Sequence, residues 1–198
     1  QTYSGTVSLT GTSILTSSGG AINFNNTVNG AASLTVNAAS DFTVDTVFGG
    51  TTPLTALTIG TTNSTNTVTV DSTSTVAGAI SIYRGILDID ETSTSTNTGN
   101  LLFQSSTDGA DSFDLANEKS ISKTGGAEST LTIKSNGMIR GDGANITSVS
   151  GTPLNVVLWS NYDGDDSDGG ISLPPKITTY GGDVWMGGSD DENGTSTW

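Results

Sequence analysis

The acidic segment 161–170 holds the side chains best suited to chemistry in this chain. Four of its aspartates fall within six residues: Asp163, Asp165, Asp166 and Asp168. Glycines within and after this cluster let the backbone fold tightly, and carboxylate oxygens presented from such a loop are the ligands that Ca²⁺ prefers in proteins. The segment therefore predicts a calcium site built from these four aspartates.

The spacing of these aspartates also permits a simpler interpretation. The common helix-flanked calcium loop needs a Gly at its sixth position for a sharp turn, and counting from Asp163 that position is Asp168. A solvated acidic turn between two strands would have the same composition. Both interpretations stay open from the sequence.

Aromatic residues around the same segment form a second candidate site. The four that we consider as ligand-binding residues are Trp159, Tyr162, Tyr180 and Trp185. Aromatic faces suit carbohydrate rings and protein interfaces, so a glycan is a candidate partner. The alternative is that the two tryptophans fill or flank the apolar core, because each stands next to a strongly apolar residue.

Catalysis is disfavoured by what the chain lacks. It contains neither His nor Cys, which removes the commonest general base and any thiolate metal site. Glycoside hydrolysis would need a pair of positioned carboxylates, whereas the acids here lie in Gly-rich loops. We therefore expect no enzymatic activity, and a polysaccharide-degrading β-helix enzyme is the least favoured alternative.

The charge of the chain excludes two classes of partner. Six basic residues stand against 20 acidic residues, a formal net charge of −14. Nucleic acid needs a cationic surface, and no apolar run is long enough to cross a membrane, so we expect neither partner. An acidic chain rich in Ser and Thr suits an extracellular or cell-surface location. A strand pattern already under way at residues 6–9 indicates a processed or excised piece of a longer protein.

Short segments with the order apolar-polar-apolar recur along the chain and predict its fold. Eight of them have this form: 22–24, 34–36, 42–44, 57–59, 68–70, 80–82, 87–89 and 131–133. Alternation with period two is typical of a short strand with one buried face, and the gaps are too short for crossover helices. A sandwich, a barrel or a β-solenoid remains. Because only 32% of residues are hydrophobic, a thin apolar column and hence an all-β parallel β-helix (β-solenoid) with loop insertions is favoured.

The composition divides this single predicted solenoid, residues 1–198, into three sections. Residues 1–95 are Thr-rich coils that end in a polar segment, 91–98, which we interpret as an exposed loop. Residues 96–150 are less regular, and segment 110–119 is interpreted as a loop or an insertion between coils. Residues 151–198 are acidic and aromatic coils punctuated by Gly-Gly pairs, with strands expected near 154–159, 171–173, 177–180 and 184–186.

Two stretches of the chain resemble a known family. The segments are 20–30, 33–38 and 47–58 in the first stretch, and 154–159, 169–173 and 177–188 in the second. Both are similar to the repeats of giant bacterial surface proteins of the filamentous-haemagglutinin type. The resemblance implies a right-handed parallel β-helix and a secreted adhesive or matrix role, and it brings no catalytic residue with it.

These observations predict an extracellular structural or adhesive repeat segment. A solenoid without end caps leaves backbone groups unpaired, so we expect it to associate with itself end to end into a fibre or surface matrix, or with neighbouring repeats of a longer chain. Asn and Thr at equal positions in successive coils would add side-chain hydrogen bonds. The alternative is an adhesin module that binds a glycan or a protein.

Overall fold

The computed structural model describes residues 1–40, 42–44, 47–60, 67–70, 80–84, 86–89, 93–95, 100–106, 112–141, 143–164, 169–172 and 176–188. For residues 42–44, and for the described residues from 67 to 95, it describes the backbone alone. All regular secondary structure in these residues is β-strand. No helix in the described residues is long and apolar enough to cross a membrane.

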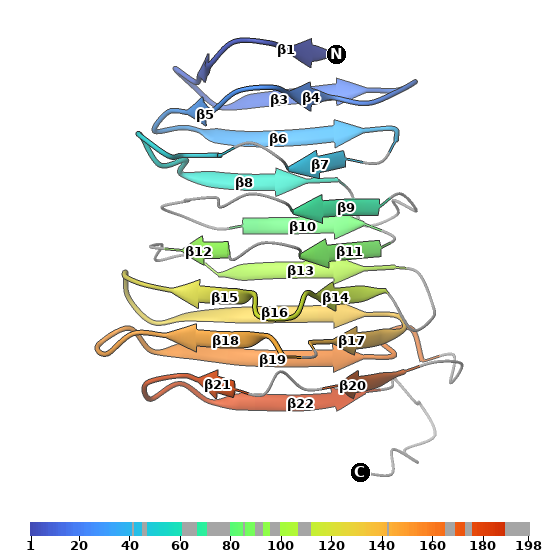
Figure 1. The fold of residues 1–198 in the computed structure, drawn as a ribbon, viewed down its shortest axis with the longest axis vertical. Coiled ribbons are helices and arrows are strands. Elements are labelled where there is room, and N and C mark those ends of the chain that lie inside the picture. Colours follow the sequence, from blue (N-terminus) through green and yellow to red (C-terminus); the bar gives the residue numbers. More distant parts are fainter. Residues whose placement is uncertain are drawn as a thin grey trace.

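The longest sheet contains eight parallel strands stacked along the long axis of the molecule (Figure 1). In order they are β3 (Ser13–Ser17), β6 (Ser33–Ala38), β8 (Ala56–Ile59), β10 (Ile80–Arg84), β13 (Leu101–Ser105), β16 (Ser129–Ser135), β19 (Leu154–Ser160) and β22 (Val184–Gly188). Each inner strand pairs with the strand of the coil before it and the strand of the coil after it. The backbone hydrogen bonds of this sheet therefore run along the axis.

Shorter parallel sheets form the other sides. One contains β7 (Phe42–Val44), β9 (Thr67–Val70), β11 (Ile86–Ile89), β14 (Phe113–Leu115), β17 (Met138–Arg140) and β20 (Gly170–Ser172), and another contains β12 (Ser93–Ser95), β15 (Ser120–Lys123), β18 (Asn145–Ser148) and β21 (Lys176–Thr178). Two further pairs join β1 (Thr2–Tyr3) to β4 (Asn23–Phe24) and β2 (Val7–Ser8) to β5 (Val28–Asn29). A coil such as β14–β15–β16 visits the six-stranded, four-stranded and eight-stranded sheets in turn. This repetition is a parallel β-solenoid, which confirms the predicted fold class.

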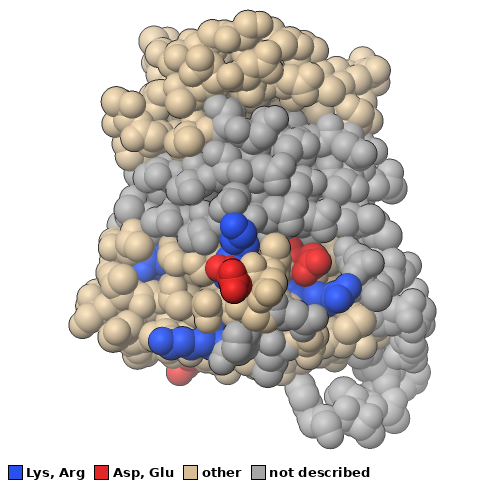
Figure 2. Space-filling model, in the orientation of Figure 1, with Lys and Arg blue, Asp and Glu red and all other residues tan. Residues whose placement is uncertain are grey.

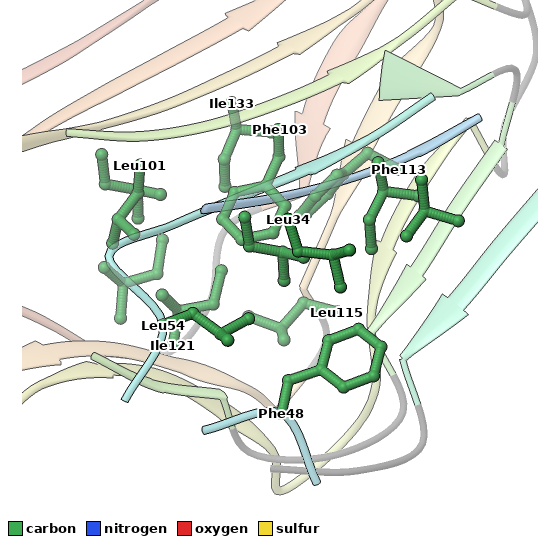
Figure 3. Packing of buried hydrophobic residues seen from close by; sticks show 14 of the residues in the cluster. Leu34, Phe48, Leu54, Leu101, Phe103, Phe113, Leu115, Ile121 and Ile133 are labelled. Carbon is green, nitrogen blue, oxygen red and sulfur yellow. The ribbon is translucent and has the colours of Figure 1, made fainter. Parts of the chain in front are cut away.

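Alternation along each strand builds the core. In β16 every second residue is buried, and the residues between them are half-buried on the outer face. The register places Phe103, Ile133 and Leu158 in one column, so like positions stack from coil to coil. Phe113 and Ile121 enter the same interior from the other two sheets (Figure 3). Each such buried side chain stabilises the fold by about 1.5–3 kcal/mol.

Polar side chains also link successive coils. Inside the solenoid, the hydroxyl of Ser105 donates to the hydroxyl of Ser135 at 2.9 Å, and Ser135 donates to the carbonyl oxygen of Met138 at 3.1 Å. On the outside, the hydroxyls of Ser122 and Thr147 lie 3.0 Å apart. Side-chain hydrogen bonds between coils are therefore present, although Ser contributes to them as well as the predicted Asn and Thr.

Asparagines at the starts of strands bond to the backbone of the following coil. The Asn100 side-chain oxygen accepts a hydrogen bond from the Thr130 backbone N–H at 2.9 Å. The Asn155 oxygen accepts one from the Asp183 N–H at 2.8 Å. These bonds satisfy backbone donors at the point where the ladder begins. The frequent Asn of this sequence thus holds the coils together where strands start.

The eight segments with alternating pattern all coincide with strands, and strands β19 to β22 occupy the positions expected in 154–186. Two interpretations of loops were wrong. Segment 110–119 contains strand β14, where Phe113 and Leu115 are buried and therefore belong to the core. Segment 91–98 contains strand β12, whose polar residues pair in parallel with β15 because the neighbouring coil fixes their backbone.

Candidate functional site

Three of the four predicted aromatic ligand residues come together on the outer face of the eight-stranded sheet. Trp159 of β19 is half-buried, and its ring meets that of Trp185 of β22 at a centroid distance of 5.8 Å and an interplanar angle of 73°. Tyr162 follows β19 and meets Trp159 edge to face at 5.0 Å. The rings face outward because Leu158, between Val157 and Trp159, occupies the core. The two tryptophans therefore flank the core and do not fill it.

Lys134 of β16 belongs to the same cluster, and the sequence did not point to it. The register places Lys134 beside Trp159. Its ammonium nitrogen lies 5.2 Å from the centroid of the Trp159 ring and 4.5 Å from that of Tyr162. A cation over two aromatic faces is attracted by their quadrupoles. We call Lys134, Trp159, Tyr162 and Trp185 the aromatic face.

The turn after β19 positions Tyr162. Asn161 adopts a positive φ of 49° and is nearly buried, and its N–H points to the carbonyl oxygen of Gly137 at 3.5 Å. The Tyr162 N–H donates to the Ser135 carbonyl oxygen at 3.0 Å, which draws the ring back over the preceding coil. The indole nitrogen of Trp159 is buried and has no hydrogen-bond partner. Ring packing and the Lys134 ammonium therefore hold that ring without a hydrogen bond from its nitrogen.

Tyr180 lies apart from the aromatic face. It occupies the turn between β21 and β22 with a positive φ of 47°, and its side chain is 53% exposed. Within the described part of the chain, the ring contacts of the aromatic face do not extend to it. Three of the four predicted aromatic residues thus lie together, and their role in ligand binding stays a prediction.

The predicted calcium loop falls mostly outside the described residues. Asp163 is exposed in the turn after Tyr162, whereas Asp165, Asp166 and Asp168 are not described. Gly164 adopts a positive φ of 73°, which shows that the backbone reverses at the start of the loop. Among the described residues, no three His, Cys, Asp or Glu side chains gather closely enough to hold a metal. The calcium site stays a prediction.

A second chemically unusual residue lies inside the solenoid. Lys123 is fully buried at the end of β15, between Ser95 and Ser148 in the register of the four-stranded sheet. Its ammonium nitrogen donates to the carbonyl oxygen of Gly125 at 2.8 Å. Burial lowers the pKa of Lys123, because the charged form loses its hydration.

The two ends of the solenoid hold hydrophobic residues that the core covers only in part. Seven hydrophobic residues pack against the core while remaining partly buried: Tyr3, Val7, Leu9, Leu15, Ile171, Ile177 and Met186. All seven belong to the first coil or to the last coil. Six of them lie in strands β1 to β3 or β20 to β22, and Leu9 lies in the turn between β2 and β3. They are only partly buried because no described residue stacks on their outer side. Among the described residues, each end of the stack therefore leaves a cross-section of the core uncovered.

The end coils also have unpaired strand edges. Within the described residues, β1, β2 and β3 each pair with one strand only, and the same holds for β20, β21 and β22. An open parallel edge is a template for another strand. Residues 1–40 contain no charged residue and no Pro, the usual devices that block such addition. The upper part of the surface in Figure 2 shows this uncharged region.

The geometry defines a class of protein, a parallel β-solenoid with an aromatic outer face and two open ends. Comparison of the chain with protein-family models, with curated proteins and with solved structures gives no match in any of the three. The function must therefore be argued from the ends and from the aromatic face.

Proposed function

We propose that this chain is a structural segment of an extracellular or cell-surface assembly and that it associates end to end through its terminal coils. One observation carries the proposal: among the described residues, the hydrophobic side chains that pack against the core but stay partly buried lie at the two ends. Apolar surface left in water at both ends of a rod is removed when rods stack. The resemblance to bacterial surface repeats agrees with this role.

In this role the chain would act as a rod held together by hydrogen bonds along its axis. Backbone hydrogen bonds run along the axis through each sheet, and the Asn and Ser bonds described above add links between coils. A stacked rod continues the same ladder across the junction, so the junction resembles the interior of the solenoid. Such a rod resists extension and proteolysis while it presents polar side chains outward.

Sedimentation velocity and electron microscopy of the purified full chain test the proposal. We expect rods that lengthen with protein concentration and have an axial repeat of about 4.8 Å between coils. Leu15→Lys places a charge on the open apolar end and should leave monomers. Thr16→Lys is the matched control, because Thr16 faces outward from the same strand and its substitution should leave the rods intact. Wild-type protein that stays monomeric at all concentrations would refute the proposal.

A glycan-binding module is the second candidate, and the aromatic face favours it. Trp185 is 44% exposed and meets the ring of Trp159 edge to face, so it offers an aromatic surface on which a sugar ring could stack. Binding on a glycan array that is lost in Trp185→Ala, with unchanged circular dichroism, would support this candidate. An array without any bound glycan would count against it.

A further inference from the structure

The first and last coils have the same order of strands. The last coil runs from β20 in the six-stranded sheet through β21 in the four-stranded sheet to β22 in the eight-stranded sheet. In the first coil β3 starts the eight-stranded sheet, and β1 pairs with β4, which lies against β7 of the six-stranded sheet. β2 lies between them in the chain, as β21 lies between β20 and β22. The first coil can therefore follow the last coil without any change of path.

We infer, resting on the proposed function, that a second copy of this chain docks with β3 on β22 in one register, which places Leu15 beside Met186 and Ile14 beside Trp185. In the same arrangement β1 follows β20 and β2 follows β21. The junction extends three parallel sheets at once. It is a heterologous contact that does not close, so it generates a fibre.

The register follows from the columns of the core. Leu15, Val36 and Ile59 are aligned at one end of the eight-stranded sheet, and Leu158 and Met186 are aligned at the other. Placing Leu15 on Met186 continues this column of large apolar side chains. A slip of two residues keeps the inward faces inward but puts a serine of β3 on Met186, because Leu15 lies between Ser13 and Ser17. The unslipped register buries more apolar surface.

Exposed hydrophobic residues in the first and last coils support the same pairing. Within the described residues, the large hydrophobic side chains that are exposed are Ile14 at 66%, Val149 at 43%, Tyr180 at 53%, Val184 at 44% and Trp185 at 44%. Four of these five lie in the first coil or the last coil. The inferred junction places the most exposed of them, Ile14, directly beside Trp185. Each then covers part of the other on the outer face.

Charge and strand direction favour contact between an N-terminal end and a C-terminal end. The alternatives are contact between two N-terminal ends or between two C-terminal ends. Residues 1–40 carry no charged side chain, whereas residues 161–198 contain eight of the 20 acidic residues and one of the six basic residues. The C-terminal part of the chain is therefore negative overall, and contact between two C-terminal ends would bring like net charges together. Two N-terminal ends would not repel, but a two-fold axis would make their edge strands antiparallel and break the parallel order. A neutral end on an acidic end avoids both costs.

Cysteine cross-linking tests the register, because the chain has no Cys of its own. Ile14→Cys and Trp185→Cys are prepared as separate single variants of the full chain and are mixed under oxidising conditions. Neighbouring parallel strands lie about 4.8 Å apart, which a disulfide spans. We expect the mixture to give at least ten-fold more disulfide-linked dimer than either variant alone. The matched control mixes Thr16→Cys with Trp185→Cys, a pair slipped by two residues and beyond the reach of about 7 Å for a disulfide.

The outcomes separate this inference from the proposed function. Rods in electron microscopy together with preferential Ile14–Trp185 linkage support both. Rods with preferential linkage of the slipped pair, or with dimers from one variant alone, overturn the register while end-to-end association stands. Rods without any linkage also overturn the register. Monomeric wild-type protein without linkage in any mixture overturns the proposed function and the register with it.

Discussion

The N-terminal and C-terminal coils share one fold but use their aromatic residues in opposite ways. In the N-terminal coils Tyr3 stacks on Phe24 at 5.1 Å, and Phe24 meets the buried ring of Phe48 edge to face at 5.4 Å, all on the inner side. In the C-terminal coils Trp159 and Trp185 lie on the outer side. The hydrogen bonds between strands do not depend on which face of a strand carries an aromatic side chain. The two ends can therefore have different surfaces on the same backbone fold.

Coil length and charge differ along the same axis. The coil from Ser13 to Leu34 spans 21 residues, whereas the coil from Leu101 to Leu131 spans 30. Residues 1–40 carry no charged side chain, whereas residues 161–198 contain eight of the 20 acidic residues. A neutral end and an acidic end give the rod a direction. Breaking one half while leaving the other intact is the most direct way to examine this difference.

Truncating one core aromatic residue in each half should lower the free energy of unfolding more than any other substitution considered below. Phe48→Ala in the N-terminal half and Phe113→Ala in the C-terminal half should each lower the free energy of unfolding by about 3–5 kcal/mol, because both rings are fully buried and leave cavities. Chemical denaturation followed by circular dichroism measures this loss. Thr132→Ala, on the outer face of β16, is the control and should cost no more than about 0.5 kcal/mol.

Hydrogen exchange would show where each truncation acts. In a solenoid each coil contacts mainly its neighbours, so Phe48→Ala should speed exchange in the N-terminal coils and leave β16 and β19 protected. Phe113→Ala should do the reverse. Equal loss of protection along the whole chain in both variants would show a single cooperative unit and contradict the division into two halves.

The strands could be predicted from the sequence wherever apolar residues alternate with polar ones, because burial of one face selects the strand. Phe113-Asp114-Leu115 has this pattern too, but its Ala- and Asp-rich surroundings resembled a helical turn or a loop. Strand β12 has no apolar residue that could reveal it, and its conformation is set by its pairing with β15 of the next coil. Local pattern identifies a strand only when that strand itself contributes to the core.

The aromatic face was predictable only in part for a related reason. Trp159 and Tyr162 are near in sequence, whereas Lys134 meets them across a full coil. Because coil lengths vary from 21 to 30 residues, the partner one coil away cannot be counted from the sequence. The register that joins Lys134 to Trp159 exists only in the folded molecule.

The pH dependence of stability should belong to the C-terminal half, where Lys123 is buried, and its effect should be smaller than that of a core truncation. Burial lowers the pKa of Lys123 below its ordinary value of 10.5. Between the lowered pKa and 10.5 the unfolded chain binds more protons than the folded chain, so the free energy of unfolding rises with pH. Below the lowered pKa the folded state holds a charged, poorly hydrated amine and is least stable.

Denaturation of wild type and Lys123→Met between pH 7 and 9.5 measures this contribution, below the ordinary ionisation of Tyr near pH 10. Lys123→Met should be more stable than wild type at the lower pH. Between pH 7 and 9.5 its free energy of unfolding should rise less than that of wild type, because the contribution of Lys123 is removed. Lys176→Met alters an exposed lysine of β21 and serves as the control. Parallel pH profiles for wild type and Lys123→Met would contradict the assignment.

The smallest expected effect concerns the outer aromatic face. Lys134→Met keeps the aliphatic stem but removes the charge over Trp159 and Tyr162, so it should lower the free energy of unfolding by about 0.5–1 kcal/mol. The fluorescence of the chain reports on this region, because two of its three tryptophans, Trp159 and Trp185, belong to the aromatic face. Gln104→Ala, next to Lys134 in the register, is the control and should leave the tryptophan signal unchanged. A shift of the tryptophan spectrum in Lys134→Met with intact rods would show that the aromatic face is not needed for end-to-end assembly. Unchanged stability and an unchanged spectrum would show that the lysine contributes nothing to the packing of the rings.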